Sequence, residues 1–285
     1  MLRSTSLASI GAALGLLAAC VCTDEHEDAE AGGDSPLADT DADADETPWL
    51  LAIDEDEGTI DALIRIGVEP GSEGEVVVVC ADLELPSEFD PDTNFTSLAY
   101  HRGVLYASAA RATWGDTLVR IDPCACTVSA VGSYGFTLVS GLASKGDSML
   151  GLAGEDDLMI TIDPATADAE QRATLSDDWG SHGLTPAGPN QDLFYGLDAA
   201  GDRLHRFDGE GAQLDSVATS EDFAAAGLEF HPGRGLLYAC GLRDQGDALV
   251  TIDPESGLVR VVAESVFMTD CDNLAGPSGP IECAG

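Results

Sequence analysis

Positive charge is scarce in this chain of 285 residues. It has 12 lysines and arginines against 52 aspartates and glutamates, and its formal net charge at pH 7 is −40. A surface with this balance repels phosphate backbones and anionic lipid headgroups. The composition therefore excludes nucleic acid as a partner, and it excludes electrostatic attachment to a bare anionic membrane.

Aromatic residues are also few, at 6% of the chain. This scarcity favours a thin, repetitive β core over a deep aromatic pocket. The 32 glycines and 13 prolines indicate many turns.

Common catalytic patterns are missing too, because no Gly-x-Ser-x-Gly elbow occurs and the histidines have no spacing typical of zinc ligands. These histidines are His26, His101, His182, His205 and His231.

The chain begins with a short apolar stretch. Arg3 precedes it, residues 7–19 are mostly apolar, and small residues lead to Cys20. The pattern predicts a signal peptide over residues 1–19, because the stretch is short for a membrane span. An ordinary cleavage site of the Ala-x-Ala type, with Cys20 merely nearby, is one interpretation of its end.

The residues Leu17-Ala18-Ala19-Cys20 resemble the lipobox of bacterial lipoproteins. The resemblance implies that diacylglycerol is attached to the Cys20 thiol, that the chain is cut before this residue and that the protein is anchored in the cell envelope. Val21 stands where an Asp marks inner-membrane retention in enteric lipoproteins, which implies the outer membrane.

Residues 20–48 are predicted to be the lipidated cysteine followed by a disordered acidic tether. From residue 23 to 47 the chain is mostly Asp, Glu, Ala, Gly and Ser, which cannot bury enough apolar surface to fold. The alternating acids of residues 39–45 are similar to calcium-binding loops but lack the turn glycine. We expect no cofactor and no metal, with Ca²⁺ at the acidic loops as the alternative.

An internal repeat runs through residues 49–285. Its clearest segment has the form Asp-x-Leu/Met-x-Arg/Thr-Ile/Phe-Asp/Gly and recurs every 41 to 55 residues, beginning at Asp61, Asp116, Asp157, Asp202 and Asp247. A small or polar residue followed by Leu recurs with a similar period, at Leu98, Leu142, Leu184, Leu228 and Leu274. Periods of about 40–50 residues with strand-like content are typical of β-propeller blades.

Two further runs complete each repeat. Short apolar segments lie between the two elements above, at residues 104–107, 149–152, 194–197 and 237–240, and a weaker run follows each Ile-Asp-Pro turn, such as residues 258–263. In such turns Pro fixes φ and the preceding Asp can accept from the backbone two residues on. The repeat therefore predicts four antiparallel strands, and the domain is predicted to be all-β.

The two ends of the repeat region are incomplete in complementary ways. The last repeat stops after its first strand near Leu274, whereas residues 49–53 match a second strand. Together, residues 270–285 and 49–80 make one blade, and pairing them removes the exposed sheet edges. We predict a β-propeller of five four-stranded blades closed by the C-terminal strand, or six blades if residues 81–95 hide a degenerate repeat.

The Leu-Tyr-Gly and Ile-Asp-Pro elements resemble those of the NHL and YncE-like extracytoplasmic repeat proteins. This resemblance implies architecture and little chemistry. Two repeats depart from the pattern, because Cys124-Ala125-Cys126 replaces the usual x-Thr-Gly and Gly209 replaces the turn proline.

Candidate ligand-binding residues come from the loops that enter the innermost strands and those that join second to third strands. In propellers these loops open on one face around the channel. Trp and Arg on such loops bury area and orient polar contacts, whereas the alternative is that Trp114 and Trp179 pack between blades. The candidates are Arg111, Trp114, Trp179, His182, Arg243, Asp270 and Asp272.

The domain has six cysteines, an even number that predicts disulfides in an exported protein. They are Cys80, Cys124, Cys126, Cys240, Cys271 and Cys283. Six thiols allow 15 pairings and the sequence does not choose among them. A metal or redox role for Cys124-Ala125-Cys126 is the alternative.

The predicted function is a monomeric, non-catalytic binding module for an unknown protein or glycan ligand, attached to the membrane through Cys20. The competing hypothesis is a propeller enzyme, a lyase or glycan-acting hydrolase, with Asp270 and Asp272 as a carboxylate pair for acid–base chemistry. A purely structural surface protein is the third hypothesis.

Overall fold

The computed structural model describes residues 48–54, 61–89, 93–110, 116–176, 179–180, 182–188, 192–268, 271, 273–277 and 281–283. All of them belong to one compact unit, Asp45–Gly285. The regular elements within these ranges are 19 β-strands. A search of the described residues for a helix long and apolar enough to cross a membrane finds none.

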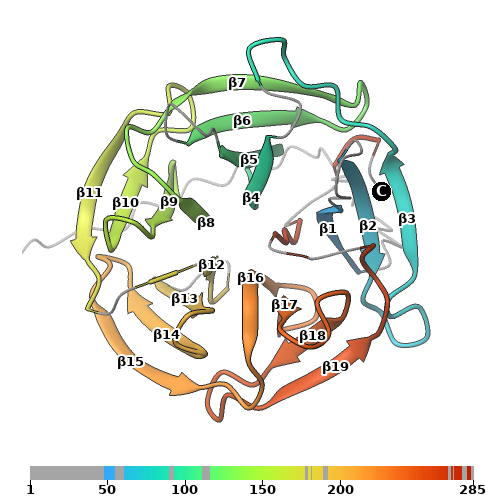
Figure 1. Ribbon diagram of the computed structural model, residues 1–285, viewed down its shortest axis with the longest axis vertical. Helices are drawn as coiled ribbons and strands as arrows, with labels where there is room; N and C mark the ends of the chain where they lie inside the picture. Colours follow the sequence, from blue (N-terminus) through green and yellow to red (C-terminus); the bar gives the residue numbers. More distant parts are fainter. Residues whose placement is uncertain are drawn as a thin grey trace, which may run out of the picture. The chain divides into compact units, whose positions relative to one another are not determined.

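The described chain forms a ring of five antiparallel blades around a central axis, a β-propeller (Figure 1). Blade 1 contains β1 (Trp49–Asp54), β2 (Ala62–Gly67) and β3 (Val76–Cys80). Blade 2 contains β4 (Asn94–His101), β5 (Val104–Ala110), β6 (Thr117–Asp122) and β7 (Thr127–Ser133). Blade 3 contains β8 (Val139–Lys145), β9 (Ser148–Ala153), β10 (Leu158–Ile162) and β11 (Ala169–Thr174).

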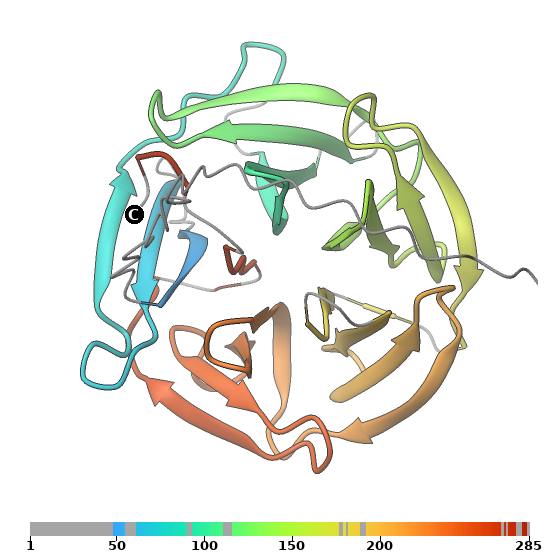
Figure 2. The same cartoon turned by 180° about the vertical axis from the view of Figure 1, so that it is seen from behind.

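Blade 4 contains β12 (His182–Pro186), β13 (Leu193–Asp198), β14 (Arg203–Asp208) and β15 (Gln213–Ala218). Blade 5 contains β16 (Phe223–His231), β17 (Leu236–Leu242), β18 (Leu249–Ile252) and β19 (Val259–Ala263). In both views of the ring the last strand of each blade lies at the rim (Figures 1 and 2). Because neighbouring blades cover both faces of the inner strands, β1 is buried throughout, whereas the rim strand β11 is largely exposed.

The C-terminal segment closes the ring as predicted. Ala275 forms an antiparallel bridge with Leu51, in which each backbone N–H donates to the other's carbonyl oxygen at 2.8 and 2.9 Å. Residues 273–277 therefore take the innermost position of blade 1. Within the described part of residues 81–95, the pairing outside β4 is one bridge from Glu84 to Thr127. The ring thus has five blades, not six.

The side chain of Asn273 extends this closing contact. Its Oδ1 accepts from the backbone N–H of Ile53 at 2.7 Å, and its Nδ2 donates to the carbonyls of Ile53 and Phe95, each at 3.3 Å. The amide therefore makes the two bonds to Ile53 that a paired backbone residue makes in a strand ladder.

Apolar side chains gather between the blades, because each sheet buries its faces against its two neighbours. Five buried clusters result, one at each of the five interfaces between blades. The interface between blades 5 and 1 contains Leu50, Ile64, Tyr238 and Leu274. Ring closure therefore buries as continuous a core as the other interfaces do.

Three of the repeated Asp residues that precede third strands link one blade to the next. The carboxylates of Asp157 and Asp202 accept from the backbone N–H groups of Trp179 and Phe223 at 3.0 and 2.8 Å, and Asp116 accepts in the same way from Val139. The three donors precede or begin the innermost strand of the following blade.

The turns between third and fourth strands have the predicted Asp contacts. A carboxylate oxygen of the turn Asp accepts from the backbone N–H two residues on, at 2.8 to 3.2 Å, in the turns that begin at Asp122, Asp163, Asp208 and Asp253. A residue with positive φ ends each turn, and in the turn with Cys124 and Cys126 that residue is Cys126, with φ of 55°.

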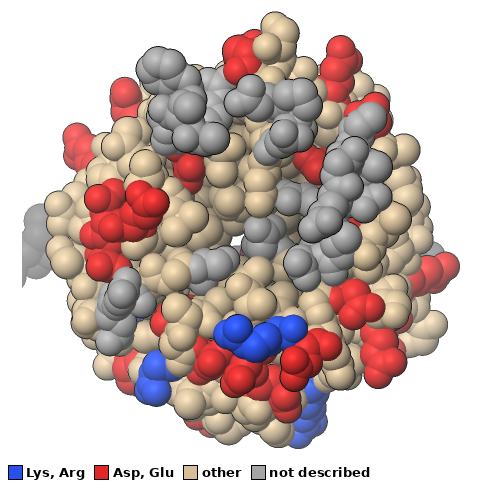
Figure 3. Space-filling model, viewed as in Figure 1, with Lys and Arg blue, Asp and Glu red and all other residues tan. Residues whose placement is uncertain are grey.

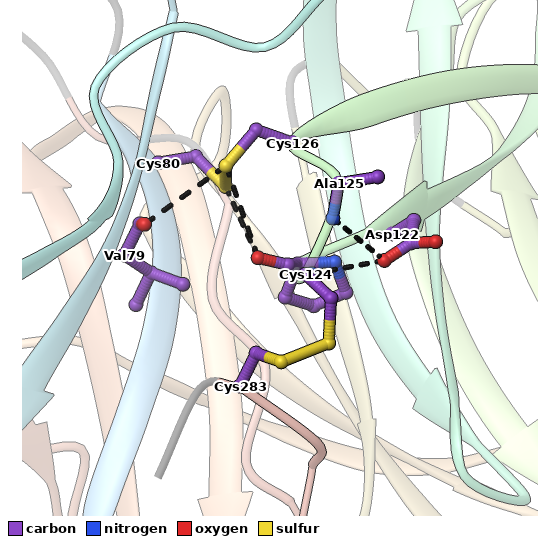
Figure 4. Close-up of a disulfide and its surroundings, with 8 residues drawn as sticks. Val79, Cys80, Asp122, Cys124, Ala125, Cys126 and Cys283 are labelled. Atoms are coloured by element: carbon purple, nitrogen blue, oxygen red, sulfur yellow. Dashed lines mark hydrogen bonds between the residues drawn. A yellow bond between two sulfur atoms is a disulfide. The ribbon is translucent and has the colours of Figure 1, made fainter.

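All six cysteines of the domain are paired in three disulfides, which confirms the predicted disulfides. Cys80 pairs with Cys126, Cys124 with Cys283 and Cys240 with Cys271. Figure 4 shows the first two side by side, with the carboxylate of Asp122 accepting from the turn between them. The first joins blades 1 and 2, and the other two fix the C-terminal segment to blades 2 and 5.

Candidate functional site

The innermost strands β4, β8, β12 and β16 all end on one side of the ring, which we call the downstream face. We call the side on which they begin the upstream face. A cavity of about 520 Å³ opens on the downstream face, lined by the last residues of these four strands and by Gly276 of the C-terminal segment. All five blades therefore contribute to it, and it lies at a mouth of the central channel.

The space-filling view along the axis shows a narrow opening at the centre of the ring (Figure 3). On the face shown, acidic side chains are spread over every side of the ring, and basic ones gather over the blades of β12–β15 and β16–β19. A small molecule that approaches the channel from the face shown therefore meets a mainly negative surface.

Glu229 of β16 supplies a carboxyl group to the cavity. It follows the repeated Leu of its innermost strand, and the four matching positions hold small residues, Ala99, Ala143, Thr185 and Ala275. Among these five equivalent positions, Glu229 is the one with a long polar side chain at the channel mouth.

The Glu229 carboxyl group is held by two donors. Its Oε2 accepts from the Thr185 hydroxyl at 3.1 Å, and the backbone N–H of Gly276 also donates to it. A side chain at Gly276 would crowd this group, because a Cβ there would lie 2.9 Å from Oε1. Burial raises the pKa of Glu229 to about 8, against the effect of these two hydrogen bonds. At neutral pH the group is therefore mostly protonated.

Lys145, the last residue of β8, is the cationic group of the cavity lining. Its Nζ lies 2.9 Å from Oδ1 of Asp192, donates to the carbonyl oxygen of Gly209 and faces the Phe194 ring at 5.5 Å from the ring centre. The positive charge is therefore neutralised locally. A Cβ at Gly209 would overlap the Asp192 carboxylate, so a proline at this turn position would require the Asp192 side chain to move away from Lys145.

Trp179 and His182 are both buried, at 2% and 0% exposed. Trp179 packs against His205 and Phe207 in the cluster between blades 3 and 4. This is the alternative considered from the sequence, in which Trp179 packs between blades and does not bind a ligand. His182 has Nε2 2.9 Å from the carbonyl oxygen of Leu152 and Nδ1 against that of Gly180, and burial lowers its pKa. The structure presents neither side chain to a ligand.

Arg243 is exposed on the upstream face, in the loop between β17 and β18. Its Nη2 donates to the carbonyl oxygen of Phe223 at 2.9 Å. The adjacent Leu242 and Asp244 line a smaller hollow of about 330 Å³. Arg243 is thus the one predicted ligand residue that the described part of the chain shows on the surface.

The other predicted site residues lie outside the described residues. They are Cys20, Arg111, Trp114, Asp270 and Asp272, together with the acidic run of residues 39–45. Within the described residues, no group of three or more His, Cys, Asp or Glu side chains is arranged to hold a metal ion.

Sequence reasoning missed the downstream cavity because it took the upstream loops as the default site. The sequence did indicate Glu229, since it is the single charged residue among the five that follow the repeated Leu, and the other four are small. Lys145 and Asp192 carried no such signal, because their 47-residue separation hides a contact between neighbouring blades.

No protein-family model matches this chain, and no curated protein matches it. It is similar in structure to a chain of a nidogen/laminin complex, with 10% identity, 80% of this chain and 97% of that chain covered and a TM-score of 0.54. It is also similar to a Bacteroides thetaiotaomicron protein of unknown function, with 14% identity, 80% and 62% covered and a TM-score of 0.51.

A glutaminyl cyclase from Myxococcus xanthus also matches, with 17% identity, 67% of this chain and 73% of that chain covered and a TM-score of 0.45. At identities this low, similarity in structure is informative about fold alone. The first two matches agree with the architecture of the described residues, and the chain contains a β-propeller domain.

Proposed function

We propose that this chain is an exported, lipid-anchored β-propeller that binds a small ligand in the downstream cavity without transforming it. One observation carries the proposal: a cavity of about 520 Å³ to which the innermost strands of all five blades contribute. This volume is within the usual range for small-molecule sites, which combine apolar walls with a few placed polar groups. Tyr100, Phe194 and Phe230 supply such walls, and Lys145 and Glu229 supply such groups.

Three disulfides support export. Disulfides persist in oxidising compartments and are rare where thiols are kept reduced, and all six cysteines of the domain are paired. The lipid anchor is proposed from the lipobox that ends at Cys20. The several acyl chains that such a cysteine carries would hold the protein stably at a membrane, whereas one chain gives only marginal binding.

Binding is favoured over catalysis by the state of the candidate catalytic groups. His182 is fully buried, with both ring nitrogens against carbonyl oxygens, and so it cannot reach a substrate. Glu229 lies in the cavity, but the other carboxylate of the described lining, Asp192, forms an ion pair with Lys145, so the lining offers no free pair of carboxylates for acid–base chemistry.

The proposal is tested by a thermal-shift panel of sugars, amino acids, amines and carboxylic acids on the full chain, followed by calorimetric titration of the ligands that raise the melting temperature. Phe230→Ala and Tyr100→Ala should weaken such ligands at least tenfold, because both residues line the cavity. Arg243→Ala on the upstream face is the matched control and should change affinity less than twofold. Binding lost in Arg243→Ala and kept in Phe230→Ala would contradict the proposed site, and turnover of any panel compound would contradict the non-catalytic function.

A further inference from the structure

The charged groups of the downstream cavity do not balance. The titratable side chains that line it are Tyr100, Lys145, Asp192 and Glu229. Lys145 and Asp192 form an ion pair and cancel. Among the described residues no cation forms an ion pair with Glu229, whose carboxyl group is held by a hydroxyl and a backbone N–H. When Glu229 ionises, the lining carries one uncompensated negative charge.

Aromatic rings surround this charge. Tyr100, Phe194 and Phe230 line the same cavity, on β4, β13 and β16. The ring face of Phe194 already has a cation against it, the ammonium of Lys145 at 5.5 Å. Aromatic faces attract cations through their quadrupole, more strongly when the pair is partly removed from water.

A carboxylate without a counter-ion beside aromatic rings is the chemistry that recognises an organic cation. Where Glu229 is ionised, a neutral ligand would gain from the rings but would leave the carboxylate charge uncompensated, and an anion would be repelled by that charge. The formal net charge of −40 adds a long-range field that raises the local concentration of cations.

We infer that the downstream cavity binds organic ammonium ions, with the Glu229 carboxylate against the positive nitrogen and Tyr100, Phe194 and Phe230 around its apolar substituents. The inference rests on the proposed binding function and names its ligand class.

Cation binding at this site is coupled to proton release. Since burial raises the pKa of Glu229 to about 8, the group is mostly protonated at pH 7 and mostly ionised at pH 9. A bound ammonium ion favours the ionised form, so the carboxyl proton passes to solvent as the ion pair forms. Affinity should therefore rise with pH between about 6 and 9 and level off above that range.

The test uses a pair of probes of nearly equal shape, choline and its uncharged carbon analogue 3,3-dimethylbutan-1-ol. Each is titrated calorimetrically into the full chain at pH 8 in 150 mM salt, which screens the long-range field. Choline should bind at least tenfold more tightly than the analogue. Titrations in two buffers of different ionisation enthalpy should show release of most of one proton per choline at pH 7 and of little at pH 9.5.

Glu229→Gln keeps the side-chain size and removes the charge, so it should bring the two probes to within about twofold and abolish proton release. Asp244→Asn, beside the upstream hollow, removes an acid elsewhere and should keep the preference for choline. Equal affinities in the unsubstituted protein, or a preference kept in Glu229→Gln, would overturn the inference and leave the binding function standing. Failure of every compound in the wider panel would overturn the binding function itself. The proton-release measurement needs no variant, so it decides even if Glu229→Gln fails to fold.

Discussion

At the scale of single residues, Glu229 makes stability depend on pH. An acid whose pKa is higher in the folded protein than in the unfolded chain binds more protons when folded. Its ionisation therefore destabilises the fold as pH rises from the unfolded value of about 4.5 to the folded value of about 8. Asp116 acts in the same direction over a lower window, because burial raises its pKa to about 6.

Glu229→Gln should remove the higher of these two windows. We expect the variant and the unsubstituted protein to melt at similar temperatures at pH 5, where Glu229 is neutral, and the variant to melt at a clearly higher temperature at pH 9. Differential scanning calorimetry from pH 5 to pH 9 measures the difference. A melting-temperature difference that stays constant across this range would show that Glu229 does not titrate as described.

The sequence predicted some residue roles and not others, for physical reasons. The turn aspartates were predictable because an Asp side chain reaches the backbone two residues on, a contact that needs no tertiary structure. The burial of Trp179 depends on His205 and Phe207 of β14, which lies two strands away from β12 in the sheet. The group of Glu229, Thr185 and Gly276 brings three blades together. Local patterns contain no information on such contacts.

At the scale of elements, ring closure depends on a short C-terminal segment. One bridge pairs Ala275 with Leu51, and the Asn273 side chain supplies the bonds to Ile53 that another paired residue would make. Disulfides at Cys271 and Cys283 fix the two ends of the segment. Side-chain bonds and disulfides thus replace much of the backbone pairing at this position.

Asn273→Ala should destabilise the propeller by about 1–3 kcal/mol, because it leaves the backbone N–H of Ile53 buried without its acceptor. Asn94→Ala is the control, since Asn94 is exposed at the start of β4, and it should cost less than about 0.5 kcal/mol. Urea unfolding with the disulfides intact measures both. Equal free energies of unfolding for the two variants would refute the closing role of Asn273.

The blade count was predictable because the repeated Leu and the repeated Asp each occur once per blade. The closing segment was predictable because the strand missing from the first repeat is present at the end of the last one. The disulfide pairing was not predictable, since it depends on which turns lie next to each other where the C-terminal segment closes the ring. Cys124 and Cys126 share one turn and still pair with partners 159 and 46 residues away.

At the scale of the whole molecule, the proposed lipid anchor gives two nearby cysteines different roles, because Cys20 ends the lipobox and Cys22 lies outside it. Cys20→Ser should leave the precursor unprocessed or release the protein from the membrane fraction, because lipid attachment needs the thiol of the lipobox. Cys22→Ser is the matched control and should fractionate like the unsubstituted protein. Membrane fractionation, followed by mass measurement of the N-terminus, shows whether each variant is processed and membrane-bound. Unchanged membrane association of Cys20→Ser would contradict the lipobox assignment.

The central claim is that the ring binds its ligand at the downstream mouth of the channel. Hydrogen–deuterium exchange of the full chain, with and without the tightest ligand of the panel, tests this claim most directly. Slower exchange is predicted at residues 142–146 and 229–232, which line the cavity, and unchanged exchange at residues 220–222 and 242–245 around the upstream hollow. Protection confined to the upstream residues would contradict the account.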